Sequence, residues 1–241
     1  MLKELYQAIR GDAAPIVLEI EGRTYTSKNV VAVSTPTPAK LTVSTLTGLV
    51  DYIKSNVDGL NVSSLLCHVE SPSKVTLNSN LLGDFADRAA FLAAELHQLQ
   101  IPLNKYLDAE AFNILLQSCF ADSEDPVKQG TDRGIVLKYV ANVKTTVETG
   151  MADDGVSQTV QAKKGIASVE NVVLPNPVTL RPYRTFVEVE QPASKFVFRA
   201  RDDDGMEFML VEADGGAWRG EAMKNIKTFL EAAVPGLNVI A

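Results

Sequence analysis

Residue types that build metal centres and disulfide frameworks are scarce in this chain. Its 241 residues include two cysteines, Cys67 and Cys119, and two histidines, His68 and His97. Neither cysteine belongs to a CxxC or CxxH pair, and both have apolar neighbours, so we expect reduced thiols in the core. Two histidines, with Glu70 beside His68, are too few for a typical metal site. We therefore expect no bound metal and no cofactor.

The chain also lacks the short motifs that accompany common enzymatic chemistry. It contains no GxGxxG or GxxxxGK[ST] phosphate loop, no GxSxG nucleophile turn and no HExxH zinc motif. A cysteine nucleophile at Cys67 or Cys119, activated by histidine, stays open as a minor alternative. The acidic residues at 122–125, 153–154 and 202–204 lack EF-hand spacing and are more typical of solvated turns than of cation sites. The sequence predicts a protein that is not an enzyme.

Long hydrophobic runs are absent as well. No apolar stretch approaches the length that spans a membrane, and the N-terminal MLKELYQAIRGD is typical of an amphipathic helix rather than a signal peptide. Hydrophobic residues make up 46% of the chain and charged residues 22%, which is ordinary for a globular protein. The net charge of -7 argues against a general binder of duplex nucleic acid. We expect a cytoplasmic protein without a membrane partner.

Short helix and strand patterns fill the first half of the chain. We expect residues 1–40 to hold a helix and a hairpin around Glu21-Gly22, and the Pro/Thr segment 34–40 is the best linker candidate. We expect residues 41–241 to form the main body, with a sub-boundary near 122–133. In this body we predict a helix over 45–56 and a hairpin of strands 65–69 and 74–78. A second helix is predicted to begin at Asp108. Residues 84–100 favour a helix by propensity, with a strand as the alternative.

Strand patterns dominate the second half. The Val-, Ile- and Thr-rich segments 134–147 and 156–169 predict a long hairpin with a bulge at 163–165. Alternation over 184–190 and 195–201 predicts another hairpin, followed by a third strand over 206–213. A helix begins near Ala217, ends before Val234-Pro235-Gly236, and precedes a short apolar tail that can add a strand. The fold class is α+β, with a mainly antiparallel sheet and a packed helix in the C-terminal half and a mixed N-terminal part.

One face of this C-terminal sheet is predicted to be too apolar for water. Strand pairing across the expected turn at 202–205 sets Phe208 beside Arg199 and Leu210 beside Val197. This face then carries Phe186, Val197, Phe208 and Leu210 among its charged residues. We expect a helix or another subunit to cover it, which predicts a homo-oligomer with these four residues at the interface.

An arginine-rich set in the same stretch is the best candidate for a ligand site. In the predicted register Arg184 and Arg201 face each other and repel unless an anion or a carboxylate such as Glu188 lies between them. The structural alternative is a cross-strand ladder of Arg and Glu residues. Gly215-Gly216 before the last helix can offer backbone amides to a phosphate. The candidate ligand-binding residues are Tyr183, Arg184, Arg199, Arg201, Trp218 and Arg219.

Five segments carry a resemblance to known sequences. They are TLTGLVDYIKSN (45–56), HVESPSKVTL (68–77), DDGVSQTV (153–160), NPVTLRPYRTFVEVEQPASKFVFR (176–199) and EADGGAWRGEAMKNI (212–226). With these segments the chain resembles a family of bacteriophage and prophage proteins of the YfdQ-like kind. The family carries no established activity or catalytic residues. The resemblance implies a phage protein that works in the host bacterial cytoplasm.

These observations lead to three functional hypotheses. The first is a non-enzymatic oligomeric binding protein that sequesters an anionic nucleotide-type ligand or blocks a host defence protein. The second is an accessory of phage replication or recombination that binds single-stranded DNA through Tyr183, Trp218 and the arginines. The third is a virion or assembly component. Net acidity counts against the second hypothesis.

Overall fold

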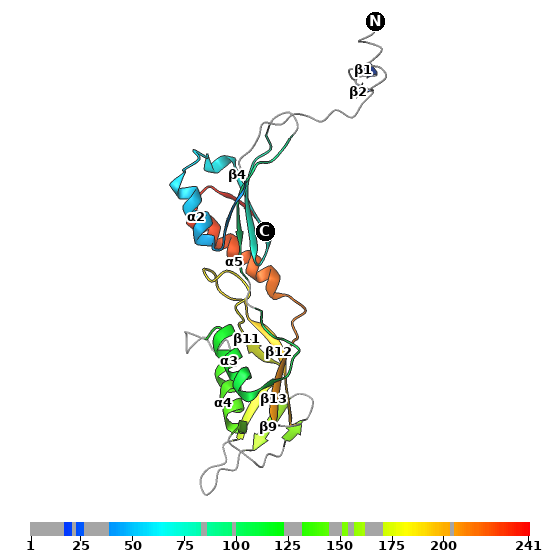
Figure 1. Ribbon diagram of the computed structural model, residues 1–241, viewed down its shortest axis with the longest axis vertical. Helices are drawn as coiled ribbons and strands as arrows, with labels where there is room; N and C mark the ends of the chain where they lie inside the picture. Colours follow the sequence, from blue (N-terminus) through cyan, green and yellow to red (C-terminus); the bar gives the residue numbers. More distant parts are fainter. Residues whose placement is uncertain are drawn as a thin grey trace, which may run out of the picture. The chain divides into compact units, whose positions relative to one another are not determined.

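The computed structural model describes residues 17–20, 23–26, 39–82, 86–97, 100–122, 132–144, 151–153, 157–161, 171–202 and 205–241. The chain divides into two compact units, Met1–Pro38 and Ala39–Ala241. In the first unit, β1 (Val17–Ile20) pairs antiparallel with β2 (Arg23–Thr26), which confirms the predicted hairpin (Figure 1). The predicted N-terminal helix and most of the segments 34–40 and 122–133 lie outside the described residues.

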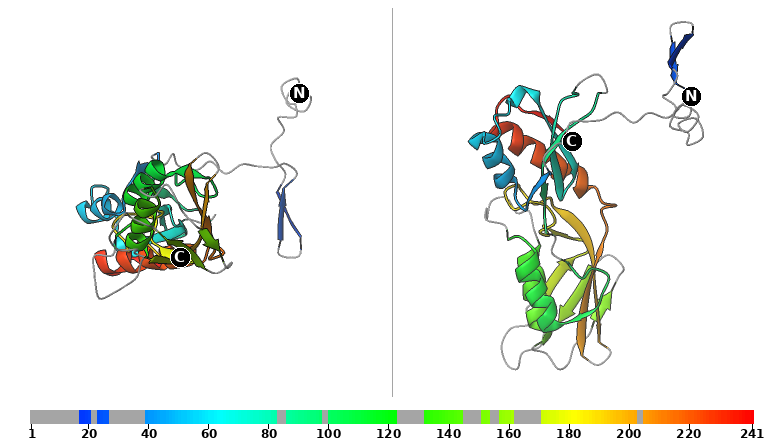
Figure 2. Two further views of the ribbon diagram at one scale, coloured as in Figure 1. Left: turned by 90° about the horizontal axis from the view of Figure 1, so that it is seen from below. Right: turned by 45° about the horizontal axis from the view of Figure 1, so that its top comes forward.

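The second unit contains a five-stranded sheet with a core of its own. Its strands lie in the order β14-β4-β5-β6-β3. The central strands are antiparallel, whereas β14 runs parallel to β4 and β3 runs parallel to β6. The bounds are β3 (Leu41–Val43), β4 (Leu65–Ser71), β5 (Lys74–Ser79), β6 (Ala90–Glu95) and β14 (Asn238–Ile240). The helices α2 (Leu46–Ser55) and α5 (Trp218–Ala233) pack against this sheet (Figure 2).

Local signals explain why α2 and the neighbouring hairpin form where the sequence predicts them. The Thr45 side chain caps α2 by accepting a hydrogen bond from the Gly48 amide at 3.0 Å. The apolar stripe of α2 is buried, and in β4 alternate residues are buried. A short 3-10 helix (Val62–Ser64) precedes β4, and the predicted C-terminal strand is β14.

Around β12 and β13 the second unit forms another core. A four-stranded antiparallel sheet has the order β11-β12-β13-β7, with β11 (Val178–Leu180), β12 (Ser194–Asp202), β13 (Met206–Glu212) and β7 (Leu107–Asp108). The helices α3 (Ala109–Cys119) and α4 (Arg133–Lys144) pack on it (Figure 1). Phe112, Tyr139 and Phe208 surround Phe198, with ring centroids 5.4–5.9 Å from it. The predicted α+β class is confirmed.

A three-stranded antiparallel sheet lies in the same unit, in the order β10-β9-β8. Its strands are β8 (Met151–Asp153), β9 (Ser157–Gln161) and β10 (Asn171–Pro175). Among the residues that the structure describes, no helix is long and apolar enough to cross a membrane.

The helix favoured for residues 84–100 and the strand predicted for residues 134–147 are wrong. Within 84–100 the structure has the strand β6, which confirms the strand alternative; Leu92, Ala93 and Ala94 are buried there, so tertiary pairing with β5 and β3 overrides the helix propensity. Residues 134–147 are predicted as a strand, but residues up to 144 belong to the helix α4. In this helix Val136, Val140 and Val143 are buried at helical spacing. The strand β9 falls within the predicted strand 156–169, and the bulge at 163–165 lies outside the described residues.

The prediction for 184–190 is also wrong, because this segment is a loop and β11 takes its place beside β12. The register of β12 and β13 differs from the prediction by one residue, since Asp202 pairs with Met206. A shift of one residue turns every side chain of a strand to the other face. Phe208 therefore lies opposite Ala200, and Leu210 lies opposite Phe198, on the core side.

This shift removes the apolar outer face on which the predicted interface depends. Phe186, Phe208 and Leu210 are each at most 2% exposed inside the chain. Of the four predicted interface residues, only Val197 lies on the other face of β12, where it is half-buried. The structure therefore corrects the placement of the interface residues. Self-association itself stays a prediction.

Candidate functional site

A single glutamine shapes the loop between β11 and β12. Gln191 is 6% exposed, and its Oε1 accepts hydrogen bonds from the backbone amides of Arg184 and Thr185 at 3.1 and 3.2 Å. Its Nε2 lies within 3.0–3.3 Å of the carbonyl oxygens of Thr185, Phe186 and Val189. These bonds give the loop backbone the partners that a strand would otherwise find in a sheet. They hold Arg184 in place.

The same loop is attached to the five-stranded sheet and its helices. The Thr185 hydroxyl donates a hydrogen bond to the Pro72 carbonyl at 2.6 Å. The Glu188 carboxylate accepts from the amide and the hydroxyl of Thr47 in the first turn of α2, at 3.0 and 3.2 Å, where the helix dipole favours a negative charge. Phe186 is fully buried in the core of that sheet. The loop thus brings Arg184 next to the turn between β4 and β5.

Arg184 is held by polar and aromatic contacts together. Its guanidinium forms an ion pair with Glu212 of β13 and a hydrogen bond with Ser194 of β12. The guanidinium carbon lies 4.0 Å from the ring centroid of Trp218, a cation–π distance. Burial lowers the pKa of Arg184, and the charge of Arg219 adds to this effect, while Glu212 opposes it. An arginine stays protonated under these conditions, so the group is a fixed positive charge.

The N-terminus of α5 contributes a second guanidinium. Ala217 at the N-cap forms no side-chain capping bond, and the Asp214 carboxylate accepts a hydrogen bond from the Gly216 amide at 2.9 Å. Gly216 has φ +80°, and a Cβ there would lie 2.3 Å from Arg219 Nη1, so glycine leaves the space that this guanidinium occupies. The guanidinium carbon of Arg219 lies 5.3 Å from the Trp218 ring. Trp218 therefore contacts two arginines.

Two cavities share Trp218 as a lining residue. The first, which we call the arginine cavity, has a volume of about 450 Å³. The turn between β4 and β5 supplies hydroxyl groups to this cavity, and the segment before β7 supplies apolar side chains. Arg184 and Arg219 supply positive charge. The lining residues are Ser71, Pro72, Ser73, Ile101, Leu103, Arg184, Trp218 and Arg219.

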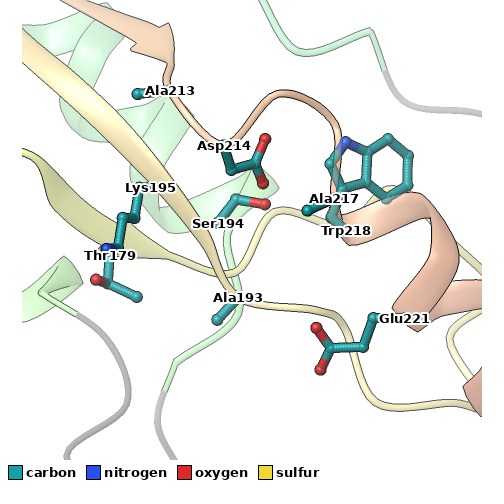
Figure 3. A pocket seen from close by; sticks show the side chains of 9 residues that line it. All are labelled: Thr179, Ala193, Ser194, Lys195, Ala213, Asp214, Ala217, Trp218 and Glu221. Atoms are coloured by element: carbon teal, nitrogen blue, oxygen red, sulfur yellow. The ribbon is translucent and has the colours of Figure 1, made fainter.

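The second cavity, which we call the acidic cavity, has a volume of about 490 Å³. Figure 3 shows its lining, which combines two carboxylates, two hydroxyls, one exposed lysine and three alanines with the indole of Trp218. The lining residues are Thr179, Ala193, Ser194, Lys195, Ala213, Asp214, Ala217, Trp218 and Glu221.

No family model, curated protein or solved structure matches this chain. The resemblance to YfdQ-like phage proteins stays a prediction. In the described part of the chain, no group of three or more His, Cys, Asp or Glu side chains is placed to hold a metal ion.

The structure brings together three of the six predicted ligand-binding residues, Arg184, Trp218 and Arg219, around the arginine cavity. The other three line neither cavity. Arg201 stacks on Tyr106 at 3.9 Å and pairs with Glu207.

Arg199 and Tyr183 are also placed elsewhere. Arg199 lies on the same face of β12 as Arg201, opposite Met209 of β13. The Tyr183 amide donates to the Cys119 carbonyl at 2.9 Å, beside the core of the four-stranded sheet. The predicted opposition of Arg184 and Arg201 is absent, because residues 184–190 do not form a strand.

For several residues of the cavity lining and of the contacts to Arg184, no sequence motif or spacing predicts that they lie near the arginines. Ser71 and Ser73 occupy an ordinary hairpin turn. They line the arginine cavity because the hydrogen bond from Thr185 to Pro72 joins this turn to the loop that carries Arg184. Glu212 and Ser194 meet Arg184 through strand pairing and loop placement. The sequence does contain the Asp214-Gly215-Gly216 turn before α5, which marks the start of this helix.

Proposed function

We propose that the protein binds a small anionic molecule of the nucleotide type in the arginine cavity. The observation that carries the proposal is Arg219, an exposed guanidinium that has no acidic partner among the described residues and lines the same cavity as Arg184. Arg184 is matched by Glu212, so Arg219 gives this cavity its excess positive charge. A bound anion would supply the missing partner.

Electrostatics around Trp218 support an anionic ligand. Two guanidiniums contact one indole, and their mutual repulsion is among the causes that lower the pKa of Arg184. An anion between the two groups would offset this repulsion. The cavity also includes the first turn of the 16-residue helix α5, whose dipole favours a negative charge.

The remaining lining residues suit a ligand with an apolar or aromatic body. Pro72, Ile101 and Leu103 offer carbon surface, while the hydroxyls of Ser71 and Ser73 can donate to a phosphate or carboxylate oxygen. An apolar wall with a few convergent polar groups is typical of small-molecule sites. A nucleotide fits this chemistry because it joins a planar base to a phosphate group.

A small ligand is favoured over single-stranded DNA. Base stacking requires an open aromatic face, but Trp218 is 8% exposed and the Arg184 guanidinium lies over its ring. The net charge of -7 also opposes binding to a polyanion. Given the resemblance to phage proteins, we propose that the protein sequesters a nucleotide signal in the host cell.

Replacement of Arg219 tests the proposal. Arg219 is exposed, so we expect Arg219→Ala to leave the fold intact and to weaken nucleotide binding by about tenfold to a hundredfold, the value of a charged hydrogen bond. Isothermal titration with nucleoside mono-, di- and triphosphates and pyrophosphate measures the affinity. The control is Lys224→Ala, which removes the same charge from an exposed position of α5 outside the cavity lining.

Two results would contradict the proposal. One is that none of these anions binds the wild-type protein in a saturable way. The other is that Arg219→Ala and Lys224→Ala weaken binding equally, which would indicate a general charge effect rather than a site.

A further inference from the structure

The arginine cavity contains little positive charge for a nucleotide site. Arg184 and Arg219 are the charged residues of its lining, in the part of the chain that the structure describes. Arg184 is matched inside the protein, since it forms an ion pair with Glu212. Burial lowers the pKa of Arg184, and the charges of Glu212 and Asp214 both act in the opposite direction. The cavity therefore offers a ligand one unmatched guanidinium, that of Arg219.

Uncharged donors in the lining are few as well. The hydroxyl oxygens of Ser71 and Ser73 lie 3.3 Å apart and share a hydrogen bond. Whichever of them donates, one hydroxyl hydrogen stays available to a ligand. The first turn of α5 adds a partial positive charge of about half a unit. These groups suit one weakly charged anion better than a chain of phosphates.

Classes of phosphate differ in the charge that they bring. A phosphate monoester carries a charge of about -1.5 to -2 near neutral pH, and a triphosphate carries more. A phosphate diester carries a single negative charge, as in the backbone of nucleic acids. Every charge beyond the first would leave water without a partner in this cavity, which costs free energy.

Protein sites for nucleoside di- and triphosphates usually compensate the additional charge with a lysine or with Mg²⁺ held by carboxylates. Neither a lysine nor a carboxylate is among the described residues that line the arginine cavity. The lining thus favours a nucleotide of low charge.

We propose that the arginine cavity is specific for a nucleotide whose phosphate is a diester, of the size of a nucleoside cyclic monophosphate. This inference rests on the proposed function, because it concerns the same cavity. The diester charge pairs with Arg219, and the base and ribose contact the apolar wall of Pro72, Ile101 and Leu103. The volume of about 450 Å³ lies in the lower part of the range of small-molecule sites, about 300–1,000 Å³, which favours one nucleotide over an oligonucleotide.

Ligands that differ only in the phosphate give a direct test. Isothermal titration of the full-length protein compares cyclic AMP, the methyl ester of AMP, AMP and ATP, and the same series with guanine, cytosine and uracil. For at least one base we expect the cyclic monophosphate to bind about tenfold more tightly than the parent monophosphate, and the triphosphate to bind most weakly. The methyl ester is a diester without the second ring, so it should also bind more tightly than the parent monophosphate.

A change of charge beside Arg184 tests the cause of this preference. Glu212→Gln keeps the size of the side chain but removes the charge that matches Arg184. We expect this variant to narrow the preference for the cyclic monophosphate over the parent monophosphate by about tenfold, because a second guanidinium becomes available to the dianion. Glu207→Gln is the control, since Glu207 lies on the same strand but pairs with Arg201 outside the cavity lining, and it should keep the wild-type preference.

The inference is overturned, and the proposed function stands, if a parent monophosphate or triphosphate binds the wild-type protein at least as tightly as its cyclic monophosphate. A cyclic dinucleotide that binds more tightly than every cyclic mononucleotide would also overturn it. An equal preference in Glu212→Gln and Glu207→Gln would contradict the charge match. If no nucleotide binds in a saturable way, the proposed function and this inference both fail.

Discussion

Tyr52 illustrates how one contact sets the behaviour of a residue. Its hydroxyl donates to Asp58 Oδ2 at 2.6 Å. Burial, the hydrogen bond to Asp58 and the negative charge of Asp58 raise the pKa of Tyr52 to about 12. The protonated phenol is thus favoured in the folded state. Its contribution to stability is complete below the unfolded pKa of about 10 and is lost as the pH rises through about 12.

We predict that Asp58→Asn lowers the pKa of Tyr52 towards the ordinary tyrosine value, because it removes the charge that opposes the phenolate. The ultraviolet absorbance of the phenolate measures the titration, and five other tyrosines provide internal references. Asp51→Asn, at an exposed position of the same helix, is the control. An unchanged late titration in Asp58→Asn would contradict the prediction.

Single residues of the site show the same dependence on neighbours. The six predicted ligand-binding residues include the two arginines that line the arginine cavity, Arg184 and Arg219, but the sequence cannot tell which arginines have acidic partners. Arg201 is matched by Glu207 and Arg184 by Glu212. These pairings are set by strand register and loop placement, which the side chains alone do not specify.

At the scale of elements, the loop between β11 and β12 depends on Gln191. We predict that Gln191→Ala lowers the free energy of unfolding by about 2–4 kcal/mol, because it leaves buried backbone amides and carbonyls of the loop without partners. Chemical denaturation monitored by circular dichroism measures the loss. The substitution should also displace Arg184, because the Arg184 amide donates a hydrogen bond to Gln191, and we therefore expect weaker nucleotide binding.

Gln117→Ala provides the control for this prediction. Gln117 is exposed on α3 and bonds to Asn113 on the same helix, so its removal should change the free energy of unfolding by at most about 0.5 kcal/mol. If Gln191→Ala were as stable as Gln117→Ala, the loop would not depend on the glutamine.

At the scale of the whole molecule, one cysteine lies in or beside each of the two large cores of the second unit. Cys67 is fully buried in the core of the five-stranded sheet, and this burial raises its pKa to about 12. Cys119 is half-buried and packs beside the core of the four-stranded sheet. Only the thiolate reacts with alkylating reagents, so burial and a high pKa both slow the reaction of Cys67.

We predict that iodoacetamide labels Cys119 of the native protein much faster than Cys67, and that both react at similar rates in denaturant. Mass spectrometry of peptides after timed labelling gives the two rates, and Cys119→Ser should leave the rate of Cys67 unchanged. Equal native rates would show that the core around Cys67 opens readily, contrary to its complete burial.

The sequence by itself determined the elements whose signals are local. Thr45 and Asp108 cap α2 and α3, the turn at 71–73 joins β4 to β5, and the alternation over 195–201 marks β12. These features depend on neighbours within a few residues, so composition and spacing suffice to predict them. The α+β class follows from such elements.

Only the tertiary structure decided β6, α4, the loop at 184–190 and the register of β12 and β13. In β6, burial between two strands outweighs the helix propensity of its alanines and leucine. In the loop, hydrogen bonds from Gln191 and Thr185 replace strand pairing. The cavities around Trp218 depend on the same long-range contacts, because they join segments that are far apart in the chain. A pattern of neighbouring residues contains no information about such contacts.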